Sequence, residues 1–198
     1  MSEKIIKEAF SETCSMYERI LKSYYPSFGN TGFTERNITF NFCNAFLKKS
    51  NDENLIVWQE VPIKNKNDEN YTEHFDSLII DDHNHKLFLI EAKRLNETRK
   101  EEDINSDLVR IKDKWSTINF GEKNDRKTYS KYLLILADIW MPYGKKSKTK
   151  LELFNWFRDY QLDGIEFLDY DSIEIKKKGQ ALTDKERYFL MYKVWKIK

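Results

Sequence analysis

Three ionisable side chains stand in two apolar segments that a short polar turn separates. The stretch EHFDSLIIDDHNHKLFLIEAKRL, residues 73–95, places Asp76 in the first segment and Glu91 and Lys93 in the second. Two carboxylates of this kind could bind a divalent cation, because Mg²⁺ takes one or two carboxylates and completes its shell with waters and substrate phosphates. The alternative is a structural ion cluster in which Lys93 neutralises one of the acids.

The spacing of these residues predicts that they share one face of a β-hairpin. If His83 and Asn84 form a two-residue turn, Asp76 lies directly opposite Glu91. A four-residue turn would place Asp76 opposite Lys93 instead. Either register keeps all three side chains on the same face, because side chains alternate along a strand. Both faces of the hairpin are largely apolar, which is typical of strands inside an α/β sheet.

The rest of the sequence predicts the elements that must position this hairpin. Apolar spacing and turn residues indicate helices over 4–24, 34–49, 96–119 and 151–160, and strands over 55–63, 74–82, 86–94, 132–139, 165–168, 173–176 and 188–197. Thr34 is the expected N-cap of the second helix. This order of helices and strands predicts an α/β fold. A length of 198 residues suits a single domain over residues 1–198.

The pattern of Asp76 followed, after a β-turn, by Glu91-Ala92-Lys93 resembles the PD-(D/E)XK nuclease superfamily. Phe75 stands where the name of the motif has proline. The resemblance implies that Asp76 and Glu91 bind Mg²⁺, for which Mn²⁺ could substitute, with help from the backbone carbonyl of Ala92. Lys93 would orient the attacking water or stabilise charge in the transition state.

The resemblance also implies a fold. It covers about residues 30–140, a restriction-endonuclease-like core in which a central mixed β-sheet is flanked by helices in the order αβββαβ. The helix over 4–24 and an α/β extension over 150–198 would lie outside that core. A second Glu-x-Lys tripeptide occurs at Glu174-Ile-Lys176, but the acids before it leave no room for a hairpin.

Two more acids are candidates because the superfamily often places acids at the corresponding positions. Glu60 lies in the strand before the hairpin, where its alternative is an exposed charge at a strand end. Glu35 opens the helix over 34–49, where a glutamate also complements the helix dipole.

Basic residues outside the hairpin could contact the phosphates of a nucleic acid. The candidates are Arg110 and, within the stretch GKKSKTK, Lys145, Lys146 and Lys148. The alternative is a solvated face in a lysine-rich protein. The formal net charge of +1 does not by itself indicate a polyanionic partner.

Together these features predict a metal-dependent nuclease that acts on DNA in restriction, defence or repair. The alternative is a nuclease-like domain that binds nucleic acid or a protein without cutting. Cleavage of both strands of a duplex would favour a homodimer. We expect a cytoplasmic protein without membrane contact, because there is no signal peptide and no apolar run of membrane-spanning length. Cys14 and Cys43, far apart in sequence, suggest no disulfide framework.

Overall fold

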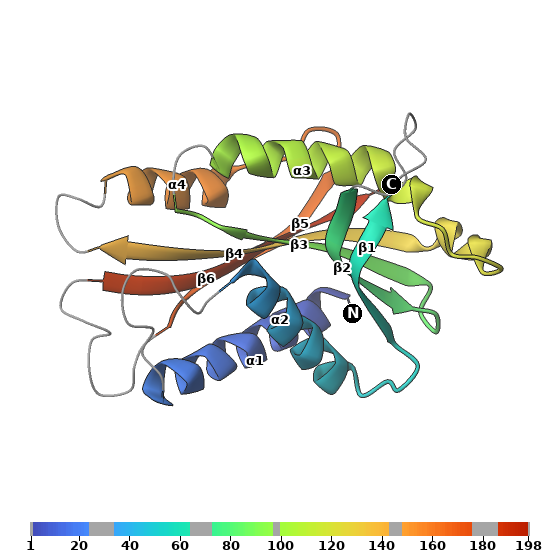
Figure 1. Ribbon diagram of the computed structural model, residues 1–198, viewed down its shortest axis with the longest axis horizontal. Helices are drawn as coiled ribbons and strands as arrows, with labels where there is room; N and C mark the ends of the chain where they lie inside the picture. Colours follow the sequence, from blue (N-terminus) through green and yellow to red (C-terminus); the bar gives the residue numbers. More distant parts are fainter. Residues whose placement is uncertain are drawn as a thin grey trace.

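The computed structural model describes residues 2–23, 34–63, 73–96, 100–142, 148–175 and 186–197. They form an α/β fold built on a six-stranded mixed sheet in the order β1-β2-β3-β4-β6-β5 (Figure 1). The parallel pair is β3 with β4, and the other neighbours are antiparallel. The strands are β1 (Ile56–Ile63), β2 (Glu73–Asp81), β3 (Lys86–Arg94), β4 (Ser130–Pro142), β5 (Glu166–Ile175) and β6 (Glu186–Ile197).

Helices cover both faces of the sheet. In Figure 1, α3 (Lys100–Lys114) and α4 (Lys148–Asp159) lie above it, and α1 (Ser2–Ser23) and α2 (Glu35–Ser50) lie below it. Two 3₁₀ turns, η1 (Trp115–Thr117) and η2 (Asn124–Thr128), lie between α3 and β4. None of the helices in the described ranges has the length and apolar character needed to cross a lipid bilayer.

The hairpin of β2 and β3 contributes to two hydrophobic clusters, one on each side of the sheet. Leu78 and Leu89 belong to the cluster that includes residues of α3, whereas Ile79 and Phe88 belong to the cluster that includes residues of α1 and α2. The prediction of a hairpin covered on both faces is therefore confirmed.

The start of α2 also follows the prediction. Thr34 is the N-cap, and its hydroxyl oxygen accepts a hydrogen bond of 3.2 Å from the backbone N–H of Asn37. Asn51, in a left-handed conformation, ends the helix. Thr34 therefore sets where α2 begins, and Glu35 is the first residue of the helix.

The C-terminal part of the chain differs from the prediction in two ways. The segments 165–168 and 173–176 are one strand, β5, which shifts its register between Phe167 and Asp169. An edge strand with half-buried side chains tolerates the polar run between them, so the sequence there looks like a loop. In addition, β6 pairs with β4 from Lys131 to Pro142, inside the sheet. The segment 150–198 is thus continuous with the sheet that carries the hairpin.

Candidate active site

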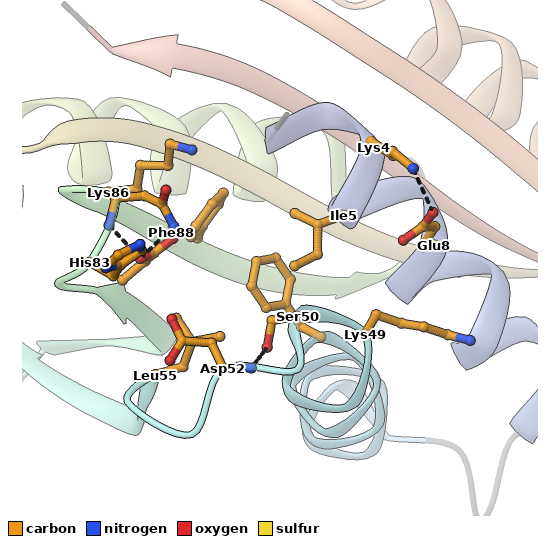
Figure 2. Close-up of a pocket in the computed structure, with 13 residues that line it drawn as sticks. Lys4, Ile5, Glu8, Lys49, Ser50, Asp52, Leu55, His83, Lys86 and Phe88 are labelled. Carbon is orange, nitrogen blue, oxygen red and sulfur yellow. Dashed lines mark hydrogen bonds and ion pairs between the residues drawn. The ribbon is translucent and has the colours of Figure 1, made fainter.

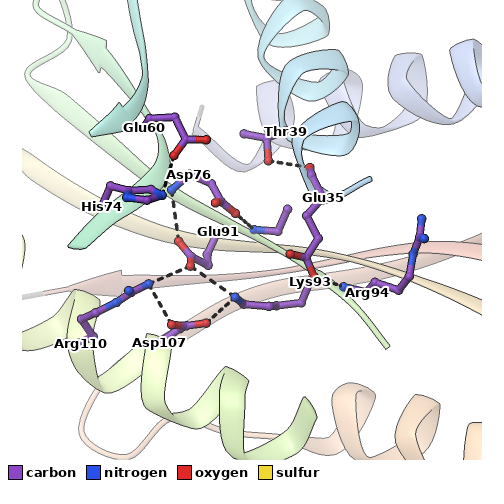
Figure 3. A network of polar contacts seen from close by, with 11 residues as sticks. Glu35, Thr39, Glu60, His74, Asp76, Glu91, Lys93, Arg94, Asp107 and Arg110 are labelled. Atoms are coloured by element: carbon purple, nitrogen blue, oxygen red, sulfur yellow. Dashed lines mark hydrogen bonds and ion pairs between the residues drawn. The ribbon is translucent and has the colours of Figure 1, made fainter. Parts of the chain in front are cut away.

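The strands β2 and β3 stop pairing where the candidate acids begin. Their register is the one predicted for a two-residue turn, but the ladder ends at Ser77 opposite Ile90. Beyond it the backbone N–H of Asp76 donates to Glu91 Oε2 at 3.3 Å, and the N–H of Ala92 donates to Asp76 Oδ2 at 2.7 Å. Carboxylate oxygens therefore take the place of backbone acceptors, and both acids are held between the strands (Figure 3).

A ring of ion pairs joins this end of the hairpin to α3. Lys93 Nζ lies 3.6 Å from Glu91 Oε1 and 2.6 Å from Asp107 Oδ2. Arg110 Nη2 lies 2.9 Å from Glu91 Oε1 and 2.8 Å from Asp107 Oδ1. Figure 3 shows the four side chains facing one another between the strand and the helix. Glu91 is only 2% exposed, so these contacts form largely away from solvent.

The surroundings of Asp76 and Glu91 disfavour the charged form of both carboxyl groups. Burial raises the pKa of Asp76. Burial, and after it the charge of Asp76, raises the pKa of Glu91 to about 8. Charged carboxylates in such a place need a positive partner or a proton. The neighbouring cations therefore offset only part of the cost of holding both carboxylates ionised.

Lys93 keeps its proton in this environment. Burial opposes its charge, but the hydrogen bond to Asp107 and the charges of Glu91, Asp107 and Glu35 outweigh burial and leave its pKa raised. A protonated lysine can donate hydrogen bonds and stabilise negative charge, but it cannot accept a proton from water.

Glu35 reaches the same region from the first turn of α2. Its Oε1 accepts a hydrogen bond of 2.8 Å from the backbone N–H of Arg94, the residue after Lys93. Its charge contributes to the raised pKa of Asp76. The glutamate thus does more than complement the helix dipole, because it links α2 to the end of β3.

Glu60 lies at the rim of the cluster. It faces Asp76 across the β1–β2 ladder, which is interrupted at this position, and it has a φ of 52°. Its carboxylate pairs with Arg36 Nε at 3.1 Å and with His74 Nε2 at 2.6 Å. Arg36, Glu60 and Asp76 help to line a hollow of about 150 Å³. A left-handed backbone in a strand is uncommon for a non-glycine residue and occurs often at functional sites.

The donor set at the hairpin fits a Mg²⁺ ion. Asp76 and Glu91 supply two carboxylates, and the carbonyl of Ala92 points to the same side of β3 as its N–H, toward Asp76. Within the described ranges, no group of three or more His, Cys, Asp or Glu side chains is arranged to hold a metal. Two carboxylates, a carbonyl and waters match the ligands of Mg²⁺, whereas the described side chains alone do not form a complete site.

Two of the four residues predicted to bind nucleic acid, Arg110 on α3 and Lys148 on α4, lie within the described ranges. Arg110 points into the ring of ion pairs, with its side chain 23% exposed. Lys148, at the start of α4, is well exposed and has a weak contact of 3.9 Å with Glu152. Lys145 and Lys146 lie outside the described residues. A phosphate-binding role for these four side chains stays a prediction.

Asp107 belongs to the site but did not emerge from the sequence. It precedes the buried Leu108 of α3 and is one helical turn from Arg110. Its position on the helix places it at the border of the apolar stripe, where a charged side chain can reach the sheet. That position alone would not have identified Asp107 as a site residue, because other charged residues lie at the same border of the stripe.

A larger hollow of about 460 Å³ lies at the turn end of the hairpin, between α1, the end of α2 and the β2–β3 turn (Figure 2). None of the candidate catalytic residues lines it. Three lysines and three acids balance one another among its lining residues, so its charge favours no class of ligand. They are Lys4, Lys49, Lys86, Glu8, Asp52 and Asp81.

Comparisons of this chain with models of protein families, with curated proteins and with solved structures found no match.

Proposed function

We propose that this protein is a metal-dependent nuclease that hydrolyses phosphodiester bonds in DNA. The observation that carries the proposal is the convergence of Asp76, Glu91 and Lys93 at the point where β2 and β3 separate. Asp76 and Glu91 provide carboxylate ligands for a divalent cation. The protonated Lys93 provides a donor for a negatively charged oxygen.

The order of the elements supports a restriction-endonuclease-like core. Along the chain, α2 is followed by β1, β2, β3, α3 and β4, which is the order αβββαβ. All of these strands belong to one mixed sheet with helices on both faces. The resemblance of the hairpin motif to the PD-(D/E)XK superfamily implies the same order, with the site at the same hairpin.

Each residue has a distinct part in the proposed reaction. Asp76 and Glu91, with the carbonyl of Ala92, would hold Mg²⁺ or Mn²⁺, which would polarise the phosphodiester and lower the pKa of a bound water. Lys93 would donate hydrogen bonds to the phosphate oxygen that gains charge in the transition state. Its raised pKa suits this role better than removal of a proton from water.

Two further acids would complete the site. Glu35 would fix the backbone beside Lys93 through the N–H of Arg94. Glu60 would stand at the hollow that reaches Asp76, where the ion or the DNA strand could approach.

A domain that binds nucleic acid or a protein without cutting is the second candidate. The closed ring of ion pairs favours it, because Glu91 already has Lys93 and Arg110 as partners. Buried ion pairs of this kind also occur for structural reasons alone.

Cleavage assays separate the two candidates. We expect the protein to cut DNA with Mg²⁺ or Mn²⁺ and not with a chelator, and RNA substrates test the choice of nucleic acid. Asp76→Asn and Lys93→Met should each reduce the rate by about 10²-fold or more, because each removes a charge needed in the transition state. If both strands of a duplex are cut, sedimentation on duplex DNA should show two protein chains per complex, as expected for a dimer.

The second Glu-x-Lys tripeptide offers a matched control. Glu174 lies on the edge strand β5 and pairs with Arg187 at 2.6 Å, away from the hairpin. Glu174→Gln should cut as the wild type does, whereas Glu91→Gln should not. Cutting that survives in Asp76→Asn and Lys93→Met, or that proceeds with chelator, would refute the proposal. Binding of DNA without cutting would support the second candidate.

A further inference from the structure

Asp107 of α3 holds the two cations of the site at the same time. Its two carboxylate oxygens contact different partners, Lys93 Nζ at 2.6 Å and Arg110 Nη2 at 2.8 Å. The side chains of Asp107 and Lys93 are each 15% exposed, so water screens the contact only in part. A carboxylate that bridges two cations in this way restricts the direction of both.

Two distances show that the Lys93 ammonium group lies closer to Asp107 than to Glu91. Its ammonium group is 2.6 Å from Asp107 but 3.6 Å from Glu91. The first distance is that of a strong charge-assisted hydrogen bond, and the second exceeds hydrogen-bond length. Lys93 is therefore drawn toward α3. Without Asp107, the nearest carboxylate of the ring for this ammonium group would be Glu91, a proposed ligand of the metal.

One N–H donor of Arg110 has no acceptor among the described residues. Its Nη2 contacts Glu91 and Asp107, but its Nε is buried and has no hydrogen-bond partner within the described part of the chain. A buried donor without an acceptor is costly. The contacts with Glu91 and Asp107 therefore hold Arg110 in an orientation that leaves this donor unpaired among the described residues.

We propose that Asp107 is a positioning residue of the nuclease site. It holds the Lys93 ammonium group 3.6 Å from Glu91, so that one cation fewer competes closely with the metal for this carboxylate. It also fixes the orientation of Lys93 and Arg110 beside the proposed metal site. The inference depends on the proposed nuclease function, but it makes a separate claim about how the cations are arranged.

Metal binding tests this claim without any cleavage. Titration of the full chain with Mn²⁺ in a calorimeter should show that Asp107→Asn binds the ion about tenfold more weakly, as is typical when an outer partner of a metal ligand is removed. The loss should disappear in the Lys93→Met background, because no ammonium group is left to occupy Glu91. A double-mutant cycle of this kind isolates the effect that passes through Lys93.

Cleavage kinetics give a second readout. Asp107→Asn should lower kcat by about 10²-fold, the usual cost of a reacting group displaced by about 1 Å, with little change in KM for DNA. Asp113, exposed on the same helix, provides the control: Asp113→Asn should change neither metal binding nor kcat. Asp107→Glu should recover part of the rate, and thermal unfolding of each variant checks that it is folded.

The outcomes distinguish this inference from the proposed function. If the wild type binds Mn²⁺ and cuts DNA but Asp107→Asn does both equally well, the positioning role is wrong and the nuclease function stands. If the affinity loss persists in the Lys93→Met background, Asp107 acts by its own charge and not through Lys93, which also overturns the inference. If the wild type neither binds the ion nor cuts, both proposals fail together.

Discussion

The stability of the wild type should fall relative to that of Glu91→Gln as the pH rises toward about 8. Burial, and after it the charge of Asp76, raises the pKa of the Glu91 carboxyl from 4.5 to about 8. Between these values the folded state binds a proton that the unfolded state releases. Wild-type stability therefore falls as the pH rises through this window, by about 1.4 kcal/mol per pH unit. From about pH 6 to pH 8 the wild type should lose roughly 3 kcal/mol relative to the glutamine variant.

Urea unfolding of both proteins across this pH range measures the effect. The difference between the two curves is the relevant quantity, because titrating groups outside the cluster around Glu91 cancel in it. Lys93 and Arg110 lose a charged partner in the variant, so the difference at a single pH has an unknown offset and its slope carries the information. Mn²⁺ should raise the stability of the wild type and leave Glu91→Gln unchanged, because ligand binding stabilises only the state that binds.

A flat difference from about pH 6 to pH 9 would refute the reasoning, because Glu91 would then titrate as an ordinary carboxyl group. Glu174→Gln supplies the baseline for removing one carboxylate from the sheet, since Glu174 lies on β5 outside the cluster.

Three further predictions concern stability and can be measured by urea unfolding. Burial lowers the pKa of Lys193 from 10.5 to about 8. Below about pH 8 the folded state therefore carries the cost of a buried charged amine. Lys193→Met should be more stable than the wild type near neutral pH by roughly 2 kcal/mol, once the lost hydrogen bond to the Tyr160 carbonyl is subtracted. Between about pH 8 and pH 10 the unfolded wild type binds this proton more tightly than the folded state does, so the gain should shrink and vanish. Asp138→Ala should cost about 3–5 kcal/mol, because the wholly buried Asp138 carboxylate pairs with Arg94 at 3.2 Å. Thr34→Ala should cost about 1 kcal/mol by removing the N-cap of α2, and no loss would show that the cap is replaced by water.

The local features of the fold could be predicted because neighbouring residues determine them. Two apolar segments joined by a polar turn give the β2–β3 hairpin, and a threonine before a helical stripe gives the start of α2. The register placed Asp76, Glu91 and Lys93 on one face for the same reason. These predictions need only the period of a strand and the chemistry of a cap.

Features that depend on distant parts of the chain could not be predicted. Asp107 reaches Lys93 because α3 crosses the hairpin at one particular height, which no local pattern specifies. The opening of the ladder at Asp76 and the positive φ of Glu60 arise where side chains compete with backbone partners. The position of β6 inside the sheet follows from the packing of all six strands.

The nested position of β6 also affects the order in which the sheet can assemble. The strand β5 joins the sheet through β6, which comes later in the chain. Residues 166–175 thus have no neighbour in the sheet until residues 186–197 arrive. A fragment ending before residue 186 would leave the long edge of β4 bare as well, and two unprotected edges invite pairing between chains. In the folded chain β6 pairs with both β4 and β5, so neither of these edges is left exposed.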